Sequence, residues 1–155
     1  AKDAERRVEL VNSVDVTIEE VLTYLDDNLT QPVIEQAFID ANTVLRDNQG
    51  RVKPFVAVSF GDLQQGYIHN MATVTGDDYT LPLRVQAVGP TPKVTRQLWS
   101  RVLELLLGKQ FSWTAEARKR PGGALFPITN TDNATEAFSF AASFGLPIQF
   151  HTGLQ

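Results

Sequence analysis

The sequence predicts an α+β domain: a mostly antiparallel, mixed sheet with two main amphipathic helices packed on it. Segments 17–29 and 92–107 repeat apolar residues at helical spacing. Segments 81–88 and 136–144 instead alternate with the period of two that a half-buried strand requires. The turn signals DNQG at 47–50 and Gly-Pro after the first of these strands separate the elements.

Length and composition limit the class of protein. The 155 residues, 43% hydrophobic and 21% charged, suit a single soluble globular domain spanning 1–155. The absence of cysteine excludes disulfides, thiolate metal sites and cysteine nucleophiles. No apolar run approaches the ~20 residues that cross a bilayer, and the charged start AKDAERRVEL differs from a signal peptide. We therefore expect a protein made in the cytoplasm with no membrane partner. Its net charge of -4 argues against a general affinity for nucleic acid phosphates.

The first helix of the expected domain covers 17–29. Residues 1–14 before it are expected to form an N-terminal arm or a short surface helix. Thr17 can cap the helix, and Glu20 three residues later completes a capping box. The far end is acidic and suits the helix dipole poorly, so it either frays or is capped by Asn28. Its apolar stripe must be covered by another layer, and consists of Ile18, Val21, Leu22, Leu25 and Leu29.

Segment 33–46 has two interpretations. Its apolar residues fit helical spacing, and Pro32 suits the first position of a helix. However, β-branched residues are frequent, and the turn signal at 47–50 would pair the segment with 52–60 as a hairpin. In either case PFVAVSF, residues 54–60, predicts a buried strand.

Residues 61–78 predict a long loop or an extended hairpin tip, because they combine polar side chains with turn signals. Loops of this length in compact domains usually carry function, which in an assembly subunit means contact with a neighbour. We therefore expect subunit contacts at Asp62, Gln64, Tyr67 and Asp77.

The segment LPLRVQAV at 81–88 predicts a half-buried strand with Arg84 and Gln86 on its polar side. After the Gly-Pro break, Thr91 and Pro92 supply the cap and the first residue of the second helix. The apolar residues of this helix form a main stripe of Val94, Leu98, Val102, Leu105 and Leu106, and a second stripe of Trp99, Leu103 and Leu107. More of its surface is therefore expected to be hidden than one stripe requires.

The one concentrated basic patch of the sequence follows this helix. Arg118, Lys119 and Arg120 precede a Pro-Gly-Gly sequence, which predicts a bent basic loop. The functional interpretation is contact with an acidic neighbour or with DNA phosphate at a channel rim, and the alternative is a solvated loop.

The terminal strand EAFSFAASF, 136–144, places its phenylalanines on one face and small residues on the other. The small-residue face contains Ser139, Ala141 and Ser143 and has no charge that would blunt it. It predicts either contact with another subunit or an interior layer within one chain. PIQF at 147–150 is expected to be one more short strand.

Catalytic, cofactor and metal motifs are absent from the sequence. It has no GxGxxG, no GxxxxGK[ST] and no GxSxG, and His69 and His151 lack the spacing of a zinc motif. The sequence therefore predicts no enzyme, no cofactor and no metal site. A small hydrolase or ligand-binding α+β domain is the alternative, and it would require a pocket that brings a histidine to a carboxylate.

The most distinctive stretches of the chain are KPFVAVSFGDLQQGY, TLPLRVQAVGPTPKVTRQLWSRVLELLLG and EAFSFAASFG. In this order they resemble the tail terminator proteins of siphophages, the phages with long non-contractile tails, and in texture those of actinobacteriophages. The resemblance is one of element order and covers about residues 15–150. It also favours the hairpin interpretation of 33–46.

The resemblance implies a structural virion protein at the head-proximal end of the tail. Such a subunit forms a hexameric ring that caps the tail tube, stops its polymerisation and provides the head–tail joining surface. The implied partners are further copies of the chain, the major tail tube protein and the head–tail connector protein, with genomic DNA only as cargo passing through the lumen. A head completion or connector ring protein of the neck is the alternative within the same particle.

Overall fold

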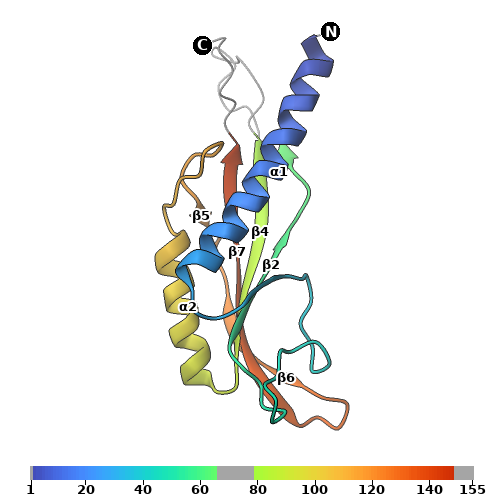
Figure 1. Ribbon diagram of the computed structural model, residues 1–155, viewed down its shortest axis with the longest axis vertical. Helices are drawn as coiled ribbons and strands as arrows, with labels where there is room; N and C mark the ends of the chain where they lie inside the picture. Colours follow the sequence, from blue (N-terminus) through green and yellow to red (C-terminus); the bar gives the residue numbers. More distant parts are fainter. Residues whose placement is uncertain (1, 66–78, 149–155) are drawn as a thin grey trace.

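The computed structural model describes residues 2–65 and 79–148 (Figure 1). Its elements are α1 (Lys2–Asn28), β1 (Val33–Glu35), β2 (Phe55–Phe60), β3 (Gln64–Gln65), β4 (Tyr79–Gly89), α2 (Pro92–Leu106), β5 (Arg118–Lys119), β6 (Ala124–Thr129) and β7 (Thr135–Ile148). The strands form one sheet in the order β1-β2-β4-β7-β5, with β3 beside β4 and β6 beside β7. Only the pair β1–β2 is parallel among the described strands. This confirms an α+β fold with a mixed, mostly antiparallel sheet.

The centre of the sheet is the pair of long strands β4 and β7. They are paired from Tyr79–Ile148 to Gly89–Phe138. The expected separate strand at 147–150 is wrong, because no new strand starts at Pro147: β7 continues through Gly145 and Pro147 to Ile148. A Cβ atom at Gly145 would lie 3.0 Å from Thr80 Cγ2, so the glycine allows close cross-strand packing instead of ending the strand.

Both helices pack on one face of the sheet (Figure 1). They cover the strand residues whose side chains alternate toward them, including Val56, Leu83 and Phe144. Tyr24 fastens α1 to the end of α2, because its hydroxyl donates to the carbonyl of Leu105 at 2.8 Å. The shared core therefore joins α1, α2 and the centre of the sheet.

Helix α1 is one continuous helix, so the expected arm or short helix at 1–14 and the separate helix start at Thr17 are wrong. Its first turns extend beyond the end of the sheet (Figure 1). Thr17 is fully buried inside the helix. The capping signal failed because nothing between 11 and 17 forces the backbone out of helical conformation: the stretch VNSVDVT contains neither glycine nor proline. At the other end, the Asn28 amide donates to the carbonyl of Tyr24 at 2.8 Å, one turn back within the helix.

Neither interpretation of 33–46 holds as a whole. Only Val33–Glu35 is a strand, and it lies parallel to β2, whereas a hairpin would place it antiparallel. The turn at 47–50 is confirmed: Arg46 and Val52 form an antiparallel bridge, and the Asp47 carboxylate accepts from the backbone N–H groups of Gln49 and Arg51. The hydrogen bond from the Arg51 backbone is the main cause that lowers the pKa of Asp47 below its usual value.

Residues 36–53, called here loop 36–53, cover one end of the opposite face of the sheet. Val44 and Val52 of this loop form a second small core with Phe55, Val88 and Ala137 of the sheet. This cover explains a further correction: Gln86, expected on a solvated face of a half-buried strand, is only 3% exposed.

Helix α2 confirms its predicted start. Thr91 is the N-cap, its hydroxyl accepts from the Val94 N–H at 3.2 Å, and Pro92 is the first helical residue. The second apolar stripe is hidden only in part, because Trp99 is buried whereas Leu107, just past the end of the helix, is 57% exposed.

Loop 36–53 is fastened to the sheet by Glu136, which gives an acid-dependence prediction. The Asn130 amide donates to Glu136 at 2.7 Å and Arg46 pairs with it at 3.2 Å, so that both lower its pKa below the usual 4.5. A carboxyl with a lowered folded pKa stabilises the fold above its unfolded pKa, and this contribution is lost as the pH falls through the folded value. We therefore expect Glu136→Gln to flatten part of the loss of thermal stability below about pH 4.5.

Thermal unfolding followed from neutral pH downward measures this effect. Glu116→Gln is the matched control, because Glu116 is an exposed carboxyl on another turn. Parallel acid profiles for wild type and Glu136→Gln would contradict the prediction.

Candidate assembly surface

The residues predicted to make subunit contacts are divided by the structure. Tyr67 and Asp77 lie outside the described residues. Asp62 is exposed in the connection between β2 and β3. Gln64 lies in β3, where it pairs with Thr80 of β4, so the start of 61–78 continues the antiparallel arrangement of β2 and β4.

The small-residue face of β7 is interior over its first half. Ser139 is fully buried and Ala141 is 9% exposed, under the cover that loop 36–53 and β6 provide. The Ser139 hydroxyl accepts from the Gln86 amide at 2.6 Å. For these two residues the interior-layer interpretation applies, and a contact with another subunit would first require this cover to open.

Over its second half, the same face is covered by neither helix in the described part of the chain. Strand alternation and register place six half-buried residues on this side, which we call the open sheet face: Ser59, Thr80, Pro82, Arg84, Ser143 and Pro147. Neither helix reaches this side, because both pack on the opposite one. Apart from Arg84, the described residues of this face therefore have small side chains.

Basic residues border the open sheet face along β5. Arg118 pairs with Gly145 of β7, and the Arg120 backbone N–H donates to the carbonyl of Ser143 at 2.8 Å. Both arginine side chains are exposed. The Lys119 ammonium turns back onto its own loop, where it donates to the carbonyls of Arg120 and Gly122. Two of the three predicted cations are therefore placed to meet a partner on this face.

Arg120 also connects two of the predicted groups. Its guanidinium donates to the Gln64 side-chain oxygen at 2.9 Å. Since β7 occupies one side of β4, β3 must lie on the β2 side, and the contact therefore joins opposite sides of the β4–β7 pair. The structure thus brings Gln64, Arg120 and Ser143 together on one surface.

The electrostatics of this surface differ from those of the whole chain. Arg84, Arg118 and Arg120 have no described carboxylate within ion-pair distance, although the protein carries a net charge of -4. Arg84 donates to the carbonyl of Ala37 at 3.1 Å and to the Gln86 side-chain oxygen at 3.3 Å. Arg84 is not among the residues predicted for an interface, although the alternation of 81–88 places it on the polar side of the strand. A surface with three arginines free of carboxylates suits a partner with negative charge.

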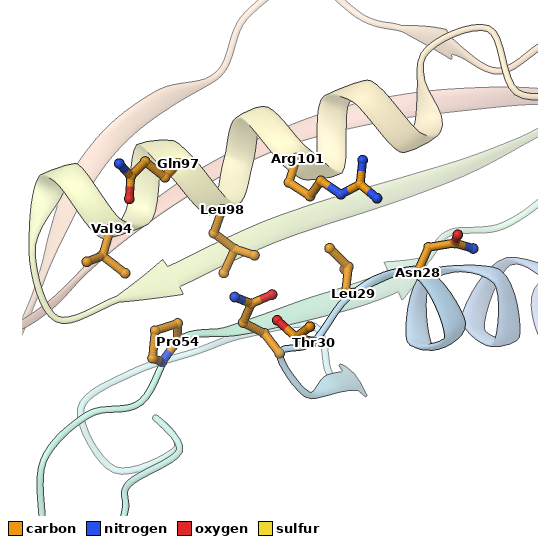
Figure 2. Close-up of a pocket in the computed structure, with 9 residues that line it drawn as sticks. Asn28, Leu29, Thr30, Pro54, Val94, Gln97, Leu98 and Arg101 are labelled. Atoms are coloured by element: carbon orange, nitrogen blue, oxygen red, sulfur yellow. The ribbon is translucent and has the colours of Figure 1, made fainter.

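A shallow cleft of about 340 Å³ lies on the helical side, between the end of α1, the first half of α2 and Pro54 (Figure 2). It contains neither a carboxylate nor a histidine. The described residues also hold no group of three or more metal-ligating side chains, and His69 and His151 lie outside them. The described cleft therefore lacks a general acid or base for catalysis.

Neither helix of the described chain combines the length and the apolar character needed to cross a bilayer.

Comparison of the sequence with models of known protein families and with curated proteins finds no match. The fold and surface define the chain as an α+β protein with a flat, arginine-bordered sheet face.

Proposed function

We propose that this chain is a structural subunit of a phage tail: a tail terminator whose copies form a ring that caps the tail tube and offers the head–tail joining surface. The observation that carries the proposal is the open sheet face, with its small-residue floor and its border of arginines. Flat surfaces of this kind suit another protein, whereas small ligands bind in concave pockets. The order of the elements, which resembles siphophage tail terminators, supports the same assignment.

The proposal gives the arginine border a specific partner. We expect it to contact acidic residues on the last ring of the major tail tube protein, while genomic DNA passes through the lumen without specific binding. The net charge of -4 supports the second part, because an acidic chain has little general affinity for nucleic acid phosphates.

The first test compares the purified chain alone and mixed with tail tubes of the phage that encodes it. Sedimentation and negative-stain microscopy should show rings, or caps confined to one end of each tube. Binding to the portal side of the neck without binding to tubes would replace the terminator assignment by that of a connector. A chain that remains monomeric at high concentration and has no affinity for tubes or neck would contradict the whole proposal.

Charge reversal tests the role of the open sheet face. The double variant Arg118→Glu and Arg120→Glu should weaken tube capping about tenfold or more, since ~1.4 kcal/mol lost at a charged contact has this effect. Lys53→Glu, an exposed charge reversal on loop 36–53, is the matched control and should cap as well as wild type. Full capping by the double variant, with unchanged thermal stability, would exclude this face from the contact.

A further inference from the structure

Phe38 is an exposed apolar side chain that the monomer does not explain. It is 83% exposed, more than any other large hydrophobic residue that the structure describes. Burying such a side chain contributes on the order of 1.5–3 kcal/mol. A phenylalanine held in water therefore marks a place where a partner can gain contact area.

The backbone around Phe38 is held in place by hydrogen bonds. The Gln36 N–H donates to the carbonyl of Val58 at 3.0 Å, and Arg84 donates to the carbonyl of Ala37. On the other side, the Asp40 carboxylate accepts from the N–H of Thr43 at 3.1 Å. Because these bonds already order the segment, little conformational entropy remains to be lost when Phe38 binds a partner.

The cleft between α1 and α2 is the receptor that we consider for Phe38. Its lining combines four apolar residues with five polar ones, namely Leu29, Pro54, Val94 and Leu98 with Asn28, Thr30, Gln31, Gln97 and Arg101. Figure 2 shows Leu98 of α2 pointing into it toward Leu29 and Thr30, with Pro54 at one end and Arg101 at the rim. Its volume of about 340 Å³ can hold an aromatic ring, yet it lies at the small end of the range for ligand pockets, about 300–1,000 Å³. The cleft is therefore large enough to take one protruding side chain.

Each of the two features has exposed charges that can pair with charges of the other. Glu35 and Asp40 flank Phe38, are exposed, and make no ion pair with another described residue. On α2, Lys93 and Arg101 lie four residues before and after Gln97, which lines the cleft, so all three share one row of the helix. Glu104, 3.4 Å from Arg101, is an exposed partner that a stronger contact can displace.

We propose that Phe38 of one copy of this chain docks in the α1–α2 cleft of a second copy, with Glu35 facing Lys93. Phe38 and the cleft are different surfaces, so each contact leaves one Phe38 and one cleft free. Such a contact builds a ring when its rotation closes and an open filament when it does not, and the proposed function requires the ring. This contact would hold the ring of the proposed function together, so its biological role rests on that proposal. Its existence is testable without any tube.

The first experiment measures self-association of the full chain by sedimentation velocity over a range of concentrations. Phe38→Ser should weaken association at least tenfold, whereas Leu107→Ser, which removes another exposed apolar side chain, should leave it unchanged. Circular dichroism and thermal unfolding should show that both variants fold like wild type. A monomeric wild type, or a Phe38→Ser variant that associates as wild type does, would overturn the proposal.

A charge exchange tests the pairing itself. Glu35→Lys and Lys93→Glu should each weaken association, and the double variant should restore most of it because the pair is re-formed with reversed signs. A double variant weaker than either single one overturns the pairing. If association depends on Phe38 but the rings do not bind tubes, the proposed function fails while this contact stands. If Phe38→Ser still associates and caps tubes, this contact fails while the function stands.

Discussion

Phe144→Ala is expected to lower the free energy of unfolding by about 3–5 kcal/mol, the typical loss for deleting a buried aromatic side chain. Phe144 is fully buried in β7, pairs with Leu83 of the neighbouring central strand, and lies under Trp99 of α2 with ring centroids 6.3 Å apart. The cavity left by alanine would separate the sheet from the helix at the centre of the core. Since a domain is stable by only about 5–15 kcal/mol, this variant should be close to unfolding.

Urea denaturation followed by tryptophan fluorescence measures the loss. Phe126→Ala is the control, because Phe126 lies on the edge strand β6 and is 37% exposed. It should lose about 1 kcal/mol or less, as expected for a residue away from a packed core. Equal losses for the two variants would mean that the core does not have its centre at β7.

The parts of the fold that sequence predicted are those decided by local chemistry. The alternation of 81–88 and the cap formed by Thr91 and Pro92 correspond to β4 and to the start of α2, because each signal lies within the element that it specifies. The two different faces of strand 136–144 were also predicted from the alternation of its residues alone. These elements would have the same local preference in almost any tertiary context.

The features that sequence missed depend on contacts between distant segments. Nothing local to Val33–Glu35 indicates a parallel partner, which is fixed by the path of the chain after α1. Ser139 is interior because β6 pairs with it and loop 36–53 packs on the neighbouring residues Val88 and Ala137. Likewise the hydrogen bond between Arg120 and Gln64 joins residues 56 positions apart. The division of strand 136–144 into a covered half and an open half therefore required the tertiary structure, and the subunit contacts expected there stay a prediction.

That division makes a second strong prediction at the buried hydrogen bond between Gln86 and Ser139. Ser139→Ala removes the acceptor and leaves the Gln86 amide, 3% exposed, without this partner. A buried polar group that loses its hydrogen bond destabilises by about 1–3 kcal/mol, which is more than the bond contributes when both partners are present. Ser143→Ala, on the open half of the same strand, should change the free energy of unfolding by less than about 0.5 kcal/mol.

The double variant Gln86→Leu with Ser139→Ala separates this explanation from a simple loss of packing. If the unsatisfied amide causes the destabilisation, removing both polar groups should recover most of the stability that Ser139→Ala lost, because apolar replacement of both partners is nearly neutral. Arg84 would lose the Gln86 oxygen but keep the carbonyl of Ala37. If instead the double variant loses as much as the sum of the single variants, the two side chains act independently, and the covered half of β7 is held by packing alone.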